Sequence, residues 1–235
     1  MKILVINPNT TLTMTRGIEA SAKRVCRPDT EIIARSPAGG VASIEGNADG
    51  IAAAYHMLSL IRELTTAQPI DGIVIACFDD TGLHAARELV ECPVIGIGEA
   101  AVHAASLISA RFSVLTSLQR SVTILERNAI ANGWSGHNFS IHASGLPVLD
   151  LESDSAYTIL LDKARTVVAR DHAECLVLGC GGMSHWTARL SQDLSVPVVD
   201  GVAAAVTLVE ALVAQGLGTS KAISYAYPLI KSPTR

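Results

Sequence analysis

Two of the five cysteines occupy matching positions, and their surroundings suggest chemistry. Cys77 follows the apolar run 73–76, and Cys180 follows the run 175–178. Small or polar residues come next, FDDTG in one place and GGMS in the other, before a predicted helix. Backbone N–H groups and a helix dipole at such positions favour a thiolate and bind an oxyanion. A thiolate and a thiol on opposite faces of an acidic carbon form the arrangement that a two-base racemase needs.

Position in the sequence separates these cysteines from the others. A cysteine at a strand end is more often a small buried hydrophobic residue than a catalyst. Cys26, Cys92 and Cys175 fit that structural role, because they lie near a helix end, before a proline and inside a strand. Cys77 and Cys180 differ from them because they occupy equivalent places in two similar segments. The odd number and scattered positions of the cysteines predict free thiols in a reducing compartment.

Other polar residues near the cysteines leave alternatives open. Asp79 either orients the first cysteine loop or caps a helix, and Asp80 and Thr81 look like helix caps. Glu45 either touches a substrate or caps a helix, and His185 either polarises the second cysteine or faces solvent. The seven histidines show no metal-binding spacing, and no dinucleotide or P-loop motif is present. We therefore expect no metal and no cofactor.

The elements that position the cysteines alternate between strands and helices. Short β-branched runs predict strands at 3–6, 31–34, 73–76, 94–97, 112–115, 140–143, 175–178 and 196–199. Segments of helical period follow them, from residue 13 and at 48–66, 82–90, 118–132, 154–170 and 185–193, with two further helices beginning near 99 and 202. Continuous apolar strands of this kind are buried on both faces of parallel sheets. The alternation predicts an α/β fold with parallel strands.

The two halves of the chain repeat one pattern. The segment 72–101 aligns with 175–205, with the cysteines, an arginine and a proline at closely similar spacings. This repeat predicts two similar α/β halves related by pseudo-twofold symmetry, with the active site in the cleft between them. The first lobe comprises 1–98 plus 208–235 and carries Cys77, and the second comprises 99–207 and carries Cys180.

Composition excludes several other functions. The chain has 235 residues, of which 49% are hydrophobic and 17% charged, with a net charge of −4 and no basic block. Nucleic acid is therefore not an expected partner. The longest apolar stretch, 196–217, is interrupted by Asp200 and Glu210, and the N-terminus turns polar too early for a signal peptide. We expect a cytoplasmic protein with no membrane association.

Motifs along the whole chain resemble the aspartate/glutamate racemase superfamily, and within it the hydantoin racemase branch. The matching segments are INPNT (6–10), ASIEG (42–46), VIACFDDTGL (74–83), RFSVLTSL (111–118), LPVL (146–149), LVLGCGGM (176–183) and VPVVDGVAAAV (196–206). The resemblance implies a cofactor-independent racemase, a homo-oligomer, with one catalytic cysteine from each half. By motif, these cysteines are Cys77 and Cys180.

The resemblance also implies a small-molecule substrate. Relatives act on 5-monosubstituted hydantoins or on allantoin, which is itself a 5-ureidohydantoin, and ACFDD looks closer to the hydantoin racemases. Glutamate racemases usually carry threonine or asparagine beside each cysteine, where this chain has Phe78 and Gly181. These two residues, and the lack of a basic residue in the loops, argue against a free amino acid.

A mechanism follows as a hypothesis. One cysteine removes the ring C5 proton, backbone N–H groups stabilise the enolate, and the other cysteine returns a proton. Side chains that follow the first strands of each half are expected to bind the ring, and others to pack against it. The expected substrate-binding residues are Pro8, Asn9, Ile44, Phe78, Asp79, Thr116, Ser117, Gly181 and Gly182. Two other readings are a lyase that decarboxylates a malonate with one cysteine, and a non-catalytic binding module for small molecules.

Overall fold

Two four-stranded parallel sheets form the framework of the protein. The computed structural model describes residues 1–151 and 153–229, with residue 154 described by its backbone alone. The first sheet has the order β2-β1-β3-β4, and the second has the order β6-β5-β7-β8. The strands are β1 (Lys2–Ile6), β2 (Glu31–Arg35), β3 (Gly72–Ile75), β4 (Val94–Gly96), β5 (Phe112–Thr116), β6 (Phe139–Ala143), β7 (Cys175–Leu178) and β8 (Val198–Asp200). The predicted α/β fold with two parallel sheets is confirmed.

The two sheets have the same topology and closely similar register. Ile6 pairs with Ile75 at the carboxyl ends of β1 and β3, and Leu115 pairs with Leu178 at the corresponding ends of β5 and β7. In each sheet the chain turns in opposite directions from these two central strands. A crevice forms beyond the carboxyl ends of parallel strands at such a switch point. Each cysteine therefore follows one of the strands that border a crevice.

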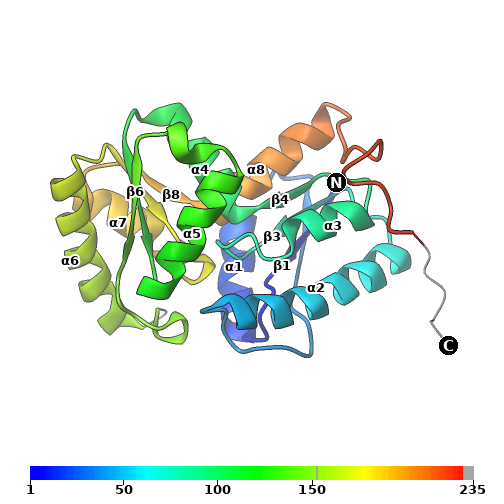
Figure 1. Cartoon of the computed structure of the whole chain (residues 1–235), viewed down its shortest axis with the longest axis horizontal. Coiled ribbons are helices and arrows are strands. Elements are labelled where there is room, and N and C mark those ends of the chain that lie inside the picture. The colour runs from blue at the N-terminus through cyan, green and yellow to red at the C-terminus, as the bar shows by residue number, and fades with distance from the viewer. Residues whose placement is uncertain (152, 230–235) are drawn as a thin grey trace.

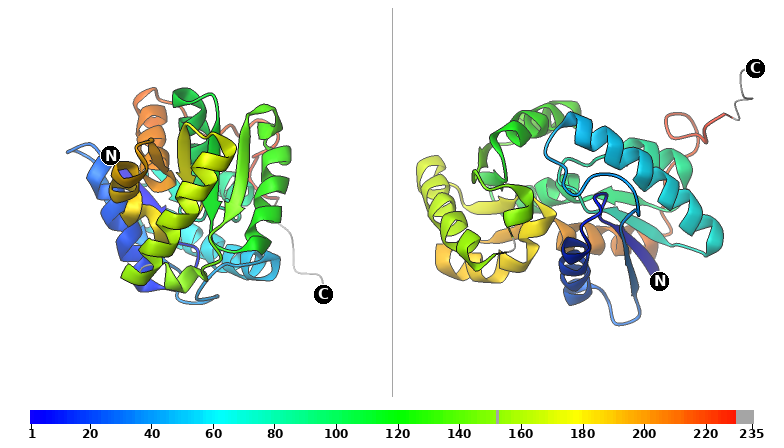
Figure 2. Two further views of the ribbon diagram at one scale, coloured as in Figure 1. Left: turned by 90° about the vertical axis from the view of Figure 1, so that its left-hand side faces the viewer. Right: turned by 90° about the horizontal axis from the view of Figure 1, so that it is seen from below.

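Eight helices connect and cover the strands within the described residues. They are α1 (Leu12–Val25), α2 (Asn47–Ala67), α3 (Leu83–Leu89), α4 (Ile97–Ile108), α5 (Gln119–Ala131), α6 (Asp154–Asp171), α7 (Thr187–Leu194) and α8 (Gly201–Ala214). The two sheets lie side by side, with α4 and α8 between them (Figures 1 and 2). The helix predicted at 185–193 begins later, at Thr187, because a 3₁₀ helix over Gly181–Trp186 precedes it.

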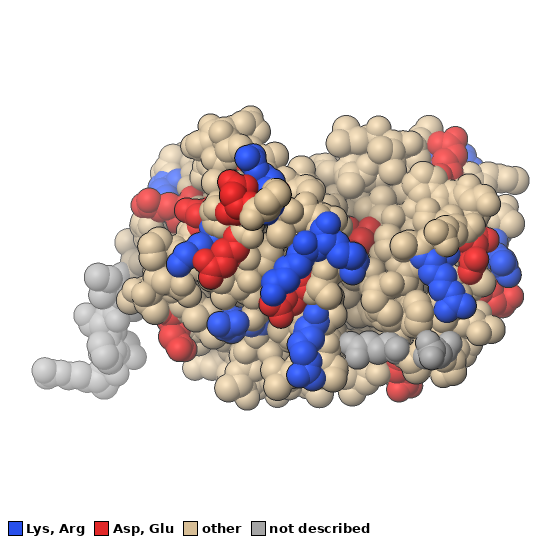
Figure 3. All heavy atoms as spheres, turned by 180° about the vertical axis from the view of Figure 1, so that it is seen from behind, with Lys and Arg blue, Asp and Glu red and all other residues tan. Residues whose placement is uncertain are grey.

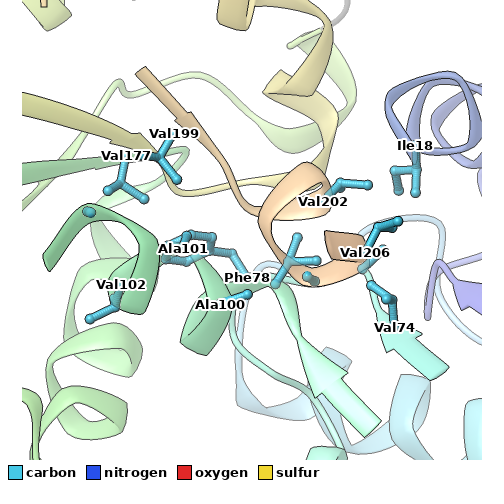
Figure 4. Close-up of a cluster of buried hydrophobic side chains, with 14 of the residues drawn as sticks. Ile18, Val74, Phe78, Ala100, Ala101, Val102, Val177, Val199, Val202 and Val206 are labelled. Atoms are coloured by element: carbon cyan, nitrogen blue, oxygen red, sulfur yellow. The ribbon is translucent and has the colours of Figure 1, made fainter. Parts of the chain in front are cut away.

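One continuous apolar core joins the two lobes. Val74 of β3 and Val177 of β7 belong to the same buried cluster, together with residues of α4 and α8. Figure 4 shows the Phe78 side chain within this cluster, near Ala100 and Val202. The lobes therefore cannot separate without exposing apolar surface that is buried in the folded protein.

The chain crosses between the lobes at α4 and α8. The predicted lobe boundary at 98/99 falls at the start of α4, and the boundary at 207/208 falls within α8. The second half of α8 packs against the first lobe, since Val209 lies beside Gly72, and the helix contacts α1 and β3. Residues 215–229 then run over the same lobe, where the Thr219 N–H donates to the Glu91 carbonyl over 2.7 Å. The division into lobes stays a prediction.

The charged residues show no segregation on the face drawn in Figure 3, where acidic and basic side chains are interspersed. Within the described residues, every helix is too short or too polar to cross a membrane.

Candidate active site

A pocket between the lobes contains both cysteine-bearing loops. It encloses about 420 Å³ of empty space, including the part open to solvent. Both crevices contribute to it. The residues that line it are Asn7, Asn9, Met14, Ile44, Ala76, Cys77, Phe78, Asp79, Thr116, Ser117, Ser121, Val148, Gly179, Cys180 and Gly181. The two loops touch at its floor, where a Cβ atom added to Gly181 would lie 3.1 Å from the Ala76 carbonyl oxygen.

Cys77 lies in a tight turn just after β3. The Asp80 N–H donates to the Cys77 carbonyl over 3.0 Å, which closes the turn. The sulfur accepts hydrogen bonds from the Thr81 hydroxyl, at 3.4 Å, and from the Asp79 N–H. Burial raises the pKa of the Cys77 thiol, the Asp79 carboxylate raises it further, and the two hydrogen bonds oppose this shift. Burial and the Asp79 carboxylate therefore favour the thiol form of Cys77 over the thiolate.

The sequence pattern favours a thiolate at Cys77, whereas burial in the structure raises the pKa of this thiol. The helix whose dipole was expected to lower the pKa, α3, begins at Leu83, next to its predicted start at 82, with Gly82 as its N-cap. The intervening turn places the sulfur in the pocket wall instead of at the helix terminus. Desolvation therefore dominates the effect on this thiol.

Cys180 lies at the N-cap of the 3₁₀ helix Gly181–Trp186, directly after β7. The Met183 N–H donates to the Cys180 carbonyl over 3.1 Å, and the Thr116 hydroxyl donates to the Gly179 carbonyl over 2.9 Å. A Cβ atom at Gly182 would lie 3.8 Å from the Cys180 sulfur. Both glycines are buried, and the lack of a Cβ at 181 and 182 lets this loop pack closely against the Ala76 carbonyl and beside the Cys180 sulfur.

The two aspartates after Cys77 have different roles. The Asp79 carboxylate lines the pocket and accepts no hydrogen bond from another residue in the described part of the chain. Burial raises the pKa of Asp79 to about 6. Asp80 instead accepts hydrogen bonds from the Gly98 and Glu99 N–H groups, both at 2.8 Å. Burial and the Glu99 carboxylate raise the pKa of Asp80, and the hydrogen bonds oppose them.

Two helix-cap predictions at this turn are therefore wrong in detail. Asp80 caps α4, which lies one strand later than the helix that it was expected to cap. Thr81 donates its hydroxyl to Cys77 and caps no helix. Sequence spacing could not show either contact, because both depend on the left-handed backbone of Asp80, with φ of 52°.

Hydroxyl and amide groups form the polar wall of the pocket. The Asn7 and Asn9 side chains bond to each other over 2.8 Å, which orients both residues after β1. The Thr116 hydroxyl donates a hydrogen bond to the Gly179 carbonyl. The Ser117 and Ser121 hydroxyls bond to no other residue in the described chain, so they are available to a ligand. Ser121 was not predicted, because its place in the first turn of α5 becomes significant only once that turn faces the pocket.

Loops from both lobes meet beside the pocket. The Val148 N–H of the second lobe donates to the Glu45 carboxylate of the first over 3.1 Å. Ile44 and Val148, next to these groups, line the pocket. Glu45 therefore joins the lobes, and it caps the 3₁₀ helix Val148–Asp150 of the other lobe instead of the helix that follows it in the chain.

Most predicted site residues meet in this pocket, and their roles stay predictions. Both cysteines line it, as do seven of the nine predicted substrate-binding residues. Pro8 and Gly182 are not among its lining residues, although Gly182 adjoins the Cys180 sulfur. The lining residues that sequence reasoning missed are Asn7, Met14, Ala76, Ser121, Val148 and Gly179, of which Asn7 and Val148 lie in the INPNT and LPVL motifs. His185 is exposed, and its ring lies against Trp186 with centroids 4.2 Å apart.

No group of three or more His, Cys, Asp or Glu side chains is arranged to hold a metal ion within residues 1–151 and 153–229.

Comparison with known proteins identifies the family. Residues 3–209 match the profile of the Asp/Glu/hydantoin racemase family. A hydantoin racemase from Rhizobium meliloti is 48% identical over 99% of this chain and 97% of its own. An allantoin racemase structure from Klebsiella pneumoniae superposes with a TM-score of 0.95 and 46% identity, covering 100% of this chain and 96% of the other. The allantoin racemase structure from Pseudomonas fluorescens gives a TM-score of 0.94 and 38% identity, covering 100% of both chains.

These findings confirm the resemblance seen in the sequence motifs and the expected racemase class of enzyme. The chain belongs to the Asp/Glu/hydantoin racemase family.

Proposed function

We propose that the protein racemises 5-monosubstituted hydantoins without a cofactor, by a two-base mechanism that uses Cys77 and Cys180. The observation that carries the proposal is that the two cysteine loops, one from each sheet, line a single pocket. Hydantoin racemases at 40–48% identity support the reaction class.

The reaction is a transfer of protons at one carbon. The substrate ring binds with C5 between the two sulfur atoms. The thiolate that faces the C5 hydrogen takes the proton, and the C–H electron pair moves into an enolate on the C4 oxygen. The thiol on the opposite face then gives its proton to the planar carbon. The product is the other enantiomer, and the two cysteines have exchanged protonation states.

The polar groups of the pocket suit a neutral ring. We expect backbone N–H groups of the cysteine loops, that of Gly181 among them, to stabilise the enolate oxygen. The Ser117 and Ser121 hydroxyls are available to the ring N–H and C=O groups. The described residues that line the pocket include no Lys or Arg. An amino acid carboxylate would therefore lack the charged partner that it needs on desolvation, whereas a hydantoin carries no such group.

Allantoin is the alternative substrate. Its ring is the same, so the proton transfers are identical, and the similar allantoin racemase structures support it equally. The difference lies in the 5-substituent, which is a ureido group in allantoin and an alkyl or aryl group in other hydantoins.

The proposal includes a cytoplasmic location and assembly into a homo-oligomer. Reduced cysteines require a reducing compartment. Exposed apolar side chains on α2, Ile51 at 75% and Tyr55 at 70% exposure, are suited to contact with a second copy. Light scattering after size-exclusion chromatography measures the assembly, and a monomer at micromolar concentration contradicts that part.

The experiment that tests the function follows the optical activity of L-5-benzylhydantoin and of (S)-allantoin, with reductant and an enzyme-free blank. We expect rapid decay to zero for benzylhydantoin. Decay for allantoin alone assigns the alternative substrate and keeps the mechanism. Flat traces for both contradict racemisation and favour a binding module, and release of CO₂ from an arylmalonate identifies a lyase.

A further inference from the structure

Each cysteine loop is tied to the N-terminus of a long helix by a carboxylate, and the two carboxylates come from different places in the chain. The Cys77 loop is tied to α4, and the Cys180 loop is tied to α8. These two helices pack against each other between the sheets (Figure 1).

In the first lobe the carboxylate belongs to the cysteine loop itself. Asp80, three residues after Cys77, accepts the Gly98 and Glu99 N–H groups of α4 at 2.8 Å. A second contact holds the turn from the other lobe, where the Asn128 side chain of α5 donates to the Asp79 carbonyl over 2.8 Å. The cysteine turn is thus attached on two sides.

In the second lobe the carboxylate belongs to the strand end. Asp200, the last residue of β8, is the N-cap of α8 and accepts the Val202 N–H at 2.9 Å. The cysteine loop reaches it through the Ser184 hydroxyl, at 2.7 Å. Ser21 of α1 also donates to Asp200 over 2.7 Å.

The two lobes place the aspartate at different points of the same framework. In the first lobe it lies in the cysteine loop and a glycine ends the strand, whereas in the second lobe the aspartate itself ends the strand. Gly96 ends β4 opposite Ile75, as Asp200 ends β8 opposite Leu178. A Cβ atom at Gly96 would lie 2.1 Å from the Asp80 carboxylate oxygen. The Asp80 carboxylate therefore occupies the space that an aspartate at 96 would need.

We infer that Asp80 and Asp200 are positioning residues, each of which sets the place of one cysteine, Cys77 directly and Cys180 through Ser184. The inference rests on the proposed two-base function. Both sulfurs must face the same carbon, and a displacement of about 1 Å lowers a rate by about 100-fold. A separate clamp for each loop lets each sulfur be aligned independently.

The test uses enzymes in which a single cysteine remains. In Cys180→Ser, Cys77 is the remaining base, and it exchanges the C5 proton of one enantiomer for deuterium in D₂O. We expect Asp80→Asn to lower this exchange by about 10- to 100-fold, because the new amide places a donor against an N–H group. Ser184→Ala is expected to change it by less than about twofold. In Cys77→Ser, Cys180 is the remaining base and the other enantiomer exchanges its proton. There we expect Ser184→Ala to cause the large loss of exchange and Asp80→Asn the small change.

The inference is overturned if Asp80→Asn and Ser184→Ala each lower deuterium exchange equally in both single-cysteine enzymes, or if they lower it in neither. Urea unfolding of each variant shows that the protein is folded. If neither single-cysteine enzyme exchanges either enantiomer, the two-base function fails, and iodoacetamide alkylation then decides the inference. The inference is supported if Asp80→Asn changes the alkylation rate of Cys77 alone and Ser184→Ala changes that of Cys180 alone. It is overturned if either variant changes the alkylation rates of both cysteines equally.

Discussion

The loops that carry Cys77 and Cys180 follow equivalent strands, yet they surround their cysteines differently. The Cys77 loop is acidic and turns through a left-handed Asp80 before a short α3. The Cys180 loop is rich in glycine and enters a 3₁₀ helix at once. The shared topology therefore determines where each sulfur lies, whereas the loop sequence determines its electrostatic surroundings. The two cysteines therefore occupy equivalent positions in the fold but have different chemical surroundings.

The largest expected effect comes from removing either cysteine. Cys77→Ser and Cys180→Ser should each lower racemisation by about 1,000-fold or more, because a serine hydroxyl does not replace a thiol as acid or base. The two enantiomers have equal free energy, so each variant must lose kcat/KM equally in both directions. Polarimetry from both enantiomers measures this.

Cys92→Ser is the matched control, since Cys92 lies outside the pocket, and its rate should stay within about twofold of the wild type. Near-normal racemisation by either active-site variant would mean that the two loops do not act as a pair.

Glycine is required beside the Cys77 loop and not at the matching place in the other lobe. A Cβ at Gly98 would lie 2.3 Å from the Phe78 carbonyl oxygen, whereas Val202 occupies the corresponding position in α8. Gly98→Ala should therefore lower the free energy of unfolding by about 1–3 kcal/mol, despite the higher helix propensity of alanine. Urea denaturation measures the change.

Gly17→Ala in α1, where nothing lies within 4 Å of the added Cβ, should instead stabilise by about 0.5–1 kcal/mol. Equal effects at the two glycines would remove the argument for close contact between this loop and α4.

Asp79 makes the stability of the first loop depend on pH. Its pKa rises from 3.8 to about 6 on folding, so the folded protein holds this proton more tightly. The ionised Asp79 carboxylate therefore lowers the free energy of unfolding above pH 6, and this loss disappears as the pH falls towards 4. Asp79→Asn should raise the free energy of unfolding by about 1–2 kcal/mol at pH 8, allowing for partial exposure. The difference should shrink between pH 6 and pH 4, and a constant difference would show that its charge is not the cause.

The smallest expected effect is on the reactivity of Cys77. The Asp79 carboxylate raises the pKa of this thiol, and the Thr81 hydroxyl lowers it. Asp79→Asn should speed iodoacetamide alkylation of Cys77 at pH 8 by about three- to tenfold, and Thr81→Val should slow it. Peptide mass spectrometry follows each cysteine separately, with Cys26 as the internal reference. Changes of the same sign in both variants would contradict this view of the loop.

The repeated pattern of apolar strands was a sufficient guide to the fold. Runs such as 73–76 and 175–178 have to be buried on both faces, which demands parallel sheets covered by helices. The side chains after these strands were predictable for the same reason, because the carboxyl ends of parallel strands meet at one edge. Ser121 was missed because it lies in a helix, where local sequence does not indicate which face meets the pocket.

The sequence by itself determined the two sheets, the placement of a cysteine at the end of one strand in each, and the family, because periodicity and local motifs are properties of neighbouring residues. Only the tertiary structure decided that Asp80 caps α4, that Thr81 bonds to the Cys77 sulfur, and that burial raises the pKa of this cysteine. Hydrogen bonds between distant segments and desolvation depend on how the lobes pack, and spacing along the chain carries no record of either.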